Sequence, residues 1–460
     1  MKPILELALV AGMLGLPACG GGGDGSAADS GTDADADTDA DTDVDTDTDT
    51  GSDTGPDTDD CFPDNYYLTS VADMDELAPY PCILGTLTVT TPAITSLSLP
   101  NLQWIGGDLT IIDNMNLADL DGMGALTSVG GDLRFEGDDA LASIAGLSAL
   151  TSVGNDLWFY GNEALASLVG LDGLASVSGS VDIRYNDGLT NLAGLGSLAS
   201  VGGDVSIISN DGLTNLAGLD ALASIEGKVN FYGNTVLESL AGLSSLASVG
   251  SLTIEDCDAL TSLSALSALT EVDGVLRVSD CGALTSVDAF YGLTSVGGDL
   301  IVGDNPALAD VEGLGGITSV GGYLALAGND VLVSADELSA ITSVGTYVSV
   351  NANAVLTTLD LSSLGWLPEQ LTIMENPALE SLEFSALTTI GTTLMIEDNG
   401  ALASLNGLSA LTSVGLNLHV LFNPMLPQCD ACDLLDQLVG FTGIVSFGGN
   451  QADTCPDECT

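Results

Sequence analysis

Hydrophobic and polar positions repeat with a period of 24 residues, from about residue 82 almost to the C-terminus. The unit is clear in Val153 to Ser176, VGNDLWFYGNEALASLVGLDGLAS, and it recurs from Val129, Val201 and Val296. Each unit contains an alternating Leu-x-Ile core, which is the pattern of a strand with one buried face. A fixed period of this length is typical of solenoids, in which each repeat completes the core of its neighbours.

The strand core occurs in sixteen rungs, and we define each rung by its first apolar residue. These residues are Leu87, Leu109, Leu133, Leu157, Val181, Val205, Val229, Leu252, Leu276, Leu300, Leu324, Val348, Leu371, Leu394, Leu418 and, after a break, Val445. The second half of each unit reads L-x-x-L-x-G-L-x-x-L. Leu at every third residue, interrupted by Gly, favours short extended or 3₁₀ pieces over a long helix. At about 4.8 Å per rung, the stack has a length on the order of 70 Å.

An Asn follows the first apolar residue by five positions in most rungs. These are Asn114, Asn162, Asn186, Asn210, Asn234, Asn305, Asn329, Asn353, Asn376, Asn399, Asn423 and Asn450. A buried polar group without a partner costs about 1–3 kcal/mol. We therefore expect the amides to turn inward as a ladder, with bonds to the backbone of their own and neighbouring rungs.

The pattern L-x-x-L-x-L-x-x-N/C-x-L is a leucine-rich-repeat signature. With V-G-G-D-L before the strand and L-x-G-L after it, the unit resembles the receptor L-domain family, the ligand-binding lobes of insulin- and growth-factor-type receptors. The resemblance covers about residues 61 to 450. It is strongest where Cys61 is followed by a short helical stretch and then by CILGTLTV from Cys82. Those lobes are short and flank a cysteine-rich region, whereas sixteen rungs run on here, so no receptor ligand is carried over.

These patterns predict an all-β fold, a right-handed parallel coil of about sixteen L-domain-like rungs with an internal Asn ladder and disulfide-stapled caps. We expect the repeat solenoid over residues 87–425. The N-terminal cap is expected over 61–86, with a short helix in Ser70 to Tyr80 and a Cys61–Cys82 disulfide. The C-terminal cap is expected over 426–460. There, Cys432 to Val439 has a helical pattern, and Ile444 to Asn450 repeats the strand and Asn as a last rung.

The N-terminus has the pattern of an export signal. Met1-Lys2 precede an apolar run from Ile4 to Leu16, too short to span a bilayer. The run ends in Leu16-Pro17-Ala18-Cys19, which resembles a bacterial lipoprotein box with Cys19 as the lipidated residue. Ordinary signal cleavage is the alternative. Residues 1–19 are therefore interpreted as a lipoprotein signal. With Gly20 next, the expected location is the outer membrane or cell surface, with membrane contact through the lipid anchor only.

Residues 20–60 contain fifteen Asp and no basic or aromatic residue, so they cannot build a core. Like charges extend such a segment, which predicts a disordered tether. The Asp-x-Asp runs raise calcium binding as an alternative. They lack the turn-forming Gly and closing carboxylate of a calcium loop, so loose counter-ion association is favoured.

The chain has nine cysteines, and assigning Cys19 to a lipid leaves eight for an oxidising compartment. Cys429, Cys432, Cys455 and Cys459 could form a zinc site, but disulfides are favoured in an exported protein. Cys257 and Cys281 replace the ladder Asn in consecutive rungs. At that spacing a disulfide and two buried thiols are both open.

Net charge and histidine content reduce the number of function classes that fit this chain. With 5 Lys+Arg against 65 Asp+Glu, a net charge of −60 argues against binding to nucleic acid or an anionic membrane. His419 is the only histidine and lies at an outward strand position. The short repeats leave no long loops to build a cleft. We expect no enzyme, no cofactor and no metal site, with a polysaccharide-cleaving enzyme as the less favoured alternative.

The outward strand positions carry the candidate site. Three of the four basic residues in the folded part lie there within rungs three to nine, together with Trp158, Tyr160 and Tyr232, and Tyr185 lies one step on. The candidate binding residues are Arg134, Trp158, Tyr160, Arg184, Tyr185, Tyr232 and Arg277. Exposed Trp, Tyr and Arg on one sheet are the composition of a recognition surface. This predicts a module that binds a protein or glycan, with the arginines available to a carboxylate. A passive structural rod is the alternative.

Overall fold

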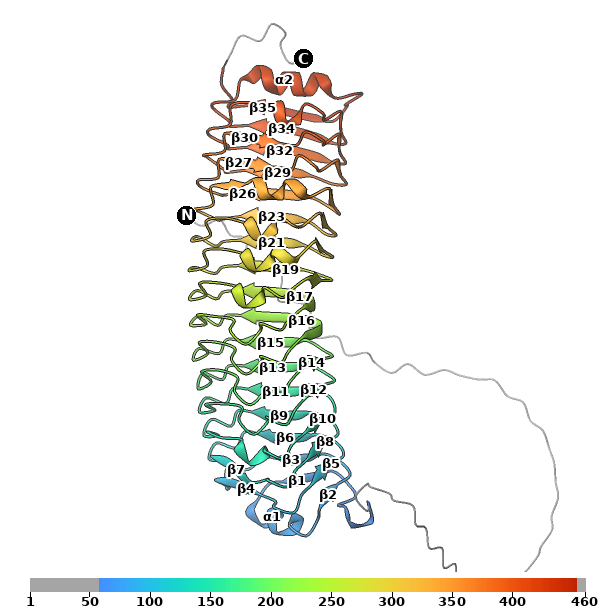
Figure 1. The fold of residues 1–460 in the computed structure, drawn as a ribbon, viewed down its shortest axis with the longest axis vertical. Coiled ribbons are helices and arrows are strands. Elements are labelled where there is room, and N and C mark those ends of the chain that lie inside the picture. The colour runs from blue at the N-terminus through green and yellow to red at the C-terminus, as the bar shows by residue number, and fades with distance from the viewer. Residues whose placement is uncertain (1–57, 453–460) are drawn as a thin grey trace, which may run out of the picture. The chain divides into compact units, whose positions relative to one another are not determined.

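The computed structural model describes residues 58–452. The chain divides into two units, residues 1–55 and 56–460, and every described residue belongs to the second. That unit is a stack of coils with a helix at each end (Figure 1). Cys19, residues 20–57, Cys455 and Cys459 lie outside the described residues.

One parallel ladder of strands runs along the stack and contains all sixteen predicted rungs. Its strands, in order of pairing, are β1 (Tyr66–Leu68), β3 (Leu87–Val89), β6 (Leu109–Ile112), β9 (Leu133–Glu136), β11 (Leu157–Tyr160), β13 (Val181–Arg184), β15 (Val205–Ile208), β16 (Ser224–Tyr232), β17 (Ser248–Glu255), β19 (Leu276–Ser279), β21 (Leu300–Gly303), β23 (Leu324–Ala327), β26 (Val348–Asn351), β29 (Leu371–Met374), β32 (Thr393–Glu397), β34 (Asn417–Leu421) and β35 (Ile444–Gly448). The predicted β-rich solenoid is confirmed.

Equivalent residues of successive rungs pair side by side, as Leu157 does with Val181. Because strand side chains alternate, Leu157 and Phe159 point inward and are fully buried, while the residues between them face outward. The core is a continuous column of such side chains. Within it, the rings of Phe135 and Phe159 stack with centroids 5.0 Å apart.

A second side of each coil is formed by two-residue strands, mostly Ser-Val. They are β2 (Cys82–Ile83), β5 (Trp104–Ile105), β8 (Ser128–Val129), β10 (Ser152–Val153), β12 (Ser176–Val177), β14 (Ser200–Val201), β18 (Glu271–Val272), β20 (Ser295–Val296), β22 (Ser319–Val320), β25 (Ser343–Val344), β28 (Trp366–Leu367), β31 (Thr389–Ile390) and β33 (Ser413–Val414). The glycine after most of these Val residues allows close stacking. A Cβ on Gly154 would lie 2.0 Å from the carbonyl oxygen of Gly130.

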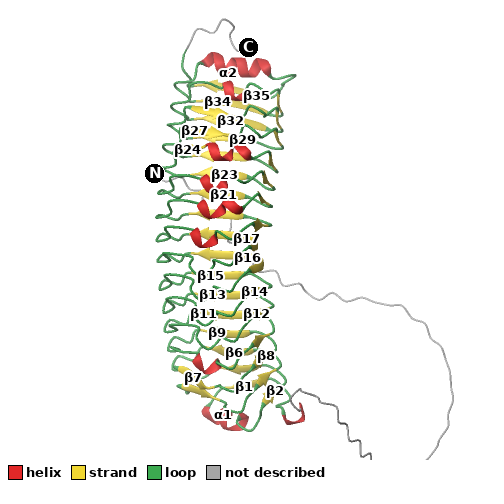
Figure 2. Ribbon diagram, viewed as in Figure 1, coloured by secondary structure: helices red, strands yellow, loops and turns green. Residues whose placement is uncertain are grey.

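The L-x-x-L half of each coil closes the third side in short pieces, as its spacing predicts. Figure 2 shows these short helices and strands among turns. The strands are β4 (Ser96–Ser98), β7 (Asp119–Gly122), β24 (Ser334–Ala335), β27 (Thr358–Asp360) and β30 (Ser381–Glu383). The 3₁₀ helices on this side are Ala145–Leu147, Ser264–Leu266, Asp288–Gly292, Glu312–Leu314, Asp336–Ala340 and Asn406–Leu408. The leucines of these pieces complete the core.

The predicted Asn ladder is present and buried, with only Asn450 partly exposed at its end. Asn186 shows the arrangement. Its Oδ1 accepts bonds from the backbone N–H and the Nδ2 of Asn162, at 3.1 and 3.0 Å. Its own Nδ2 donates to the carbonyls of Phe159 and Arg184, at 3.0 and 2.9 Å. One amide thus joins consecutive coils and satisfies backbone groups that the turn leaves open.

Beyond the first rung, which has Pro92 five positions after its first apolar residue, three rungs depart from Asn at this register. Cys257 and Cys281 are free thiols, so no disulfide joins them. Both are fully buried and lie against backbone carbonyls, with Cys281 Sγ 3.3 Å from the oxygen of Ser279. Of the two open alternatives, the structure has the buried thiols. The third departure is Asp138, which is also fully buried.

The N-terminal cap contains the predicted helix and disulfide. Helix α1 (Val71–Leu77) begins after Ser70, whose N–H donates to the carboxylate of Asp73 at 2.9 Å. Cys61 and Cys82 are bonded, with Cα atoms 4.6 Å apart. One feature was not predicted: β1, which pairs with β3 ahead of the first rung. Its three residues, Tyr-Tyr-Leu, are too few to show a strand period.

At the C-terminal cap, helix α2 (Gln428–Gln437) begins four residues earlier than predicted, directly after Pro427. It therefore includes Cys429, and both Cys429 and Cys432 are disulfide-bonded. The predicted last rung is β35, which pairs with β34 along its length. In the part of the chain that the structure describes, no helix is both long enough and apolar enough to cross a membrane.

Candidate functional site

The parallel register brings the candidate residues onto one outward face. One row along the stack, joined by strand pairing from β9 to β19, reads Arg134, Trp158, Asp182, Ser206, Asn230, Thr253 and Arg277. The next row reads Glu136, Tyr160, Arg184, Ile208, Tyr232, Glu255 and Ser279. All candidate residues except Tyr185 lie in these two rows, and Tyr185 follows Arg184 directly.

The tyrosines are the most exposed members of this face. Tyr160, Tyr185 and Tyr232 are 43%, 47% and 43% exposed. The rings of Tyr160 and Tyr185 meet edge to face, with centroids 5.3 Å apart. Tyr232 lies three rungs from Tyr160 along the same row, a distance of about 14 Å at strand spacing. We call Tyr160, Tyr185, Ile208 and Tyr232 the tyrosine strip.

Tyr185 has an unusual backbone conformation. Its φ is +57°, in the left-handed region that bulky residues seldom occupy. The same position has positive φ in the other rungs from β6 on. Gly137, Gly161 and Gly233 hold it in some rungs, and residues such as Ser209 and Phe422 hold it in others. The left-handed turn is therefore a feature of the repeat, and in this rung it carries a large aromatic ring at the edge of the outward face.

Each arginine of the face already has a carboxylate partner, which differs from the expectation that they are open to a ligand. Arg134 pairs with Glu136, and its guanidinium carbon lies 5.5 Å from the centroid of the Trp158 ring. Arg277 pairs with Glu255 at 3.0 Å and donates from Nε to Ser279 Oγ, also at 3.0 Å. These pairs fix the arginine side chains against the sheet.

The third pair, between Arg184 Nε and Asp182 Oδ1 at 2.5 Å, is the most enclosed. Asp182 is 7% exposed, and its burial raises the pKa of its carboxyl while the bond from Arg184 lowers it. Removing Arg184 would leave a buried carboxylate without its partner. Arg184 therefore supports the face from within, and its replacement is not a neutral test of binding.

The ion pairs make this part of the surface electrically balanced. Arg134, Arg184 and Arg277 each neutralise one carboxylate of the same face, within a chain of net charge −60. What remains accessible between them is tyrosine ring, isoleucine and small polar side chains. Such a surface suits an uncharged ligand better than the carboxylate partner that the sequence indicated.

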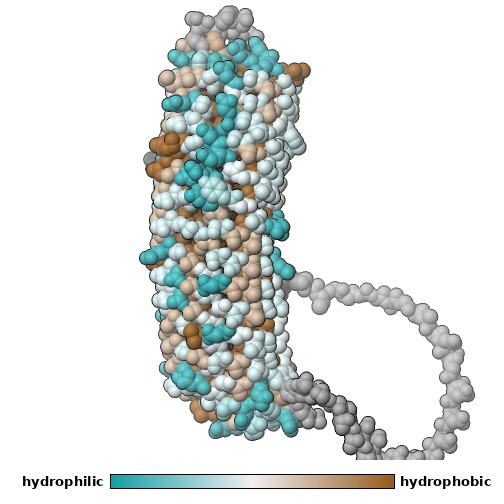
Figure 3. All heavy atoms as spheres, in the orientation of Figure 1, coloured by the Kyte–Doolittle hydropathy of each residue, from teal (hydrophilic) through white to brown (hydrophobic). Residues whose placement is uncertain are grey.

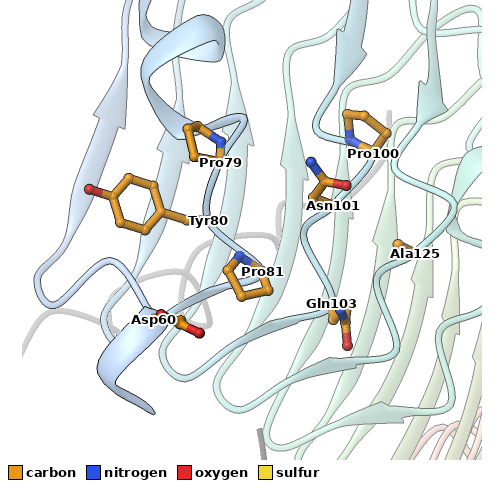
Figure 4. Close-up of a pocket in the computed structure, with 8 residues that line it drawn as sticks. All are labelled: Asp60, Pro79, Tyr80, Pro81, Pro100, Asn101, Gln103 and Ala125. Atoms are coloured by element: carbon orange, nitrogen blue, oxygen red, sulfur yellow. The ribbon is translucent and has the colours of Figure 1, made fainter. Parts of the chain in front are cut away.

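A separate hollow of about 690 Å³ lies at the N-terminal cap, which the sequence did not indicate. Figure 4 shows Pro79, Tyr80 and Pro81 on one side of it and Asn101 and Gln103, from the next coil, on the other. Asn101 Nδ2 donates to the carbonyl of Ala78 at 2.8 Å, which ties the two sides together. The residues that line this hollow do not form a pair of catalytic groups, so the lining does not indicate a reaction.

Among residues 58–452, no three His, Cys, Asp or Glu side chains are grouped so that they could hold a metal ion. His419 lies on β34, between Met395 and Ser446 of the neighbouring strands. On the side of the molecule seen in Figure 3, hydrophobic residues form small groups among pale and hydrophilic ones, without a continuous apolar surface.

Comparison with known proteins leaves the family open. No protein-family model matches the chain, and no curated protein matches its sequence.

Proposed function

We propose that this chain is a membrane-anchored recognition or adhesion module that binds a protein or a glycan through the tyrosine strip. The observation that carries the proposal is the half-exposed ring of Tyr185, packed edge to face against the ring of Tyr160, with Tyr232 exposed further along the same face. Rigid aromatic side chains offer large contact area with little conformational entropy to lose. The balanced charge around them supports an uncharged binding epitope.

The fold relationship proposed for this module is with receptor L domains. Support comes from the Cys61–Cys82 cap, the single inward Asn of most coils and the leucine-spaced turns. In this proposal the chain is a long variant of that repeat, in which a ligand lies across several rungs. The ligand of any one receptor is not part of the proposal.

Replacing Tyr160 by Ser and Tyr185 by Gly should weaken ligand binding about tenfold or more for each substitution, the effect of losing a binding hot spot. Both substitutions introduce a residue that another coil has at the same position: Ser279 is equivalent to Tyr160, and Gly161 is equivalent to Tyr185. Because Tyr185→Gly also relieves the left-handed strain, thermal stability should be unchanged or higher. A glycan array and cell-binding assays with the full chain, followed by titration of the ligand found, would measure the effect.

A matched control is Ala325→Ser, on the outward row but six rungs beyond the Tyr185 rung. It should leave binding unchanged. The passive-rod alternative requires the opposite result for the tyrosines. If the double variant binds cells and ligands as well as the unaltered chain, the strip is not the recognition surface and the rod becomes the better interpretation.

The anchor belongs to the same proposal, because a recognition module must be held at the surface it serves. We expect mass spectrometry of the mature protein, made in a bacterium that processes lipoproteins, to find a diacylglyceryl cysteine at Cys19 as the first residue. Cys19→Ser should move the protein from the membrane fraction to the aqueous fraction. A mature N-terminus at another residue contradicts lipidation.

A further inference from the structure

A groove of about 420 Å³ lies on the Ser-Val side of the stack, away from the tyrosine strip in sequence and in rung. Strands β20, β22 and β25 form its floor, and Trp366 and Pro368 lie at its end. Ser295, Ser319 and Ser343 stand in register along it, one rung apart. The floor and the wall therefore differ in chemistry: hydroxyl groups along the length, and one indole at the end.

Trp366 interrupts a row of small hydroxyl residues. Ser343 precedes it by one coil, and Thr389 and Ser413 follow it in the paired strands β31 and β33. The indole is 56% exposed, so the core does not hold it. A large aromatic ring at a position that neighbouring coils fill with Ser or Thr forms a wall above the floor.

The preceding residue departs from the repeat as well. Gly365 occupies the position of Thr342 and Thr388, and a Cβ there would meet no atom within 4 Å. Neither packing nor a positive φ calls for glycine at this position, unlike Gly154 in the close stack. The two departures are adjacent in sequence, so the repeat changes at two consecutive positions in this coil.

The groove is also free of charge. Its lining consists of serine, valine, glycine, tryptophan and proline, although the chain has 65 acidic residues. A charged ligand would find no counter-charge in this lining, and an anionic one would also meet the field of the whole chain.

We propose that this groove binds an uncharged oligosaccharide. One sugar ring packs against the Trp366 indole, as aromatic faces accept apolar ring surfaces. The following sugars lie along the serine row, where the hydroxyls of Ser343 and Ser319 donate to and accept from sugar hydroxyls. The chain of the sugar runs parallel to the stack, so that each rung presents one hydroxyl group to it.

The test is a titration of the full chain with neutral hexasaccharides of glucose and of N-acetylglucosamine, an oligogalacturonate, and an uncharged apolar peptide. Calorimetry and tryptophan fluorescence report binding. At least one neutral hexasaccharide should bind and change the fluorescence, while the oligogalacturonate and the peptide should not bind. Failure of every neutral hexasaccharide overturns the proposal, as does binding of the peptide in their place.

A variant that restores the repeat sharpens the test. Trp366→Ser should lower affinity for the sugar at least tenfold and keep the thermal midpoint of the unaltered chain. The Tyr160→Ser, Tyr185→Gly chain should bind this sugar normally, which separates the groove from the tyrosine strip. Unaltered affinity in Trp366→Ser refutes the site.

Discussion

Replacing Asn186 by alanine should lower the free energy of unfolding by about 2–5 kcal/mol, because it leaves buried backbone groups without partners at about 1–3 kcal/mol each. The N–H of Asn162 loses the oxygen that accepts it at 3.1 Å, and the carbonyl of Phe159 loses its amide donor. Both lie beside an amide that is fully buried, where water cannot replace the lost bonds without opening the stack.

Denaturant unfolding gives the size of this effect, and hydrogen exchange gives its place. The Asn162 amide should exchange much faster in the variant, while amides several rungs away keep their protection, since each coil contacts mainly its neighbours. Asn116→Ala is the matched control. Asn116 also donates to a backbone carbonyl of the previous coil, Pro92 at 2.8 Å, but from an exposed position. Equal losses from the two substitutions would contradict a special role for the buried ladder.

The repeat explains why so much of the fold can be predicted. A strand core that recurs every 24 residues places each rung without knowledge of its contacts, and all sixteen predicted rung starts lie within ladder strands. The inward Asn could be predicted in the same way, because a recurring polar residue in an apolar coil needs internal partners. The start of helix α2 is predicted less accurately, because its sequence belongs to no repeat. The signal for this start is Pro427, which directly precedes the helix.

The position of the candidate site could be predicted from the sequence, but the ion pairs that neutralise its arginines were not predicted. Its rows follow from the register, and Tyr160 and Tyr232 lie where alternation places them, while Tyr185 follows the last outward position of its strand. The ion pairs were missed, although Arg134 and Glu136 are two residues apart on one strand, as are Asp182 and Arg184. Residues at that spacing face the same side of a sheet. The signal was therefore present. The Trp366 groove is different, because its depth depends on how three coils pack.

Asp138 supplies the second large effect, because it puts a carboxyl group where the neighbouring rungs have an amide. Its Oδ1 accepts bonds from the N–H and Nδ2 of Asn114, at 2.8 and 2.9 Å. Its Oδ2 is buried and has no hydrogen-bond partner. In the next rung, the corresponding amide nitrogen of Asn162 donates to the carbonyl of Phe135. A carboxylate cannot make that bond.

Burial therefore raises the pKa of Asp138 from 3.8 to about 6, although the bonds from Asn114 act in the opposite direction. The folded chain holds this proton more tightly than the unfolded chain. The resulting stabilisation is complete below about pH 4 and is lost as the pH rises through 6. A shift of about two pKa units corresponds to about 3 kcal/mol between those limits.

Asp138→Asn should remove this loss and restore the ladder donor. At pH 7.5 the variant should be more stable than the unaltered chain by about 2–3 kcal/mol, the size of the charge penalty that it removes. The difference should shrink as the pH falls and approach zero below about pH 4, where Asp138 becomes protonated in both states. Denaturant unfolding across this pH range measures it, and comparing two chains of nearly equal charge cancels most of the general acidic repulsion. Asp121→Asn, an exposed substitution that removes one negative charge, is the control. An equal gain in that variant, or a gain for Asp138→Asn that does not change with pH, would show that the buried carboxyl group is not the cause.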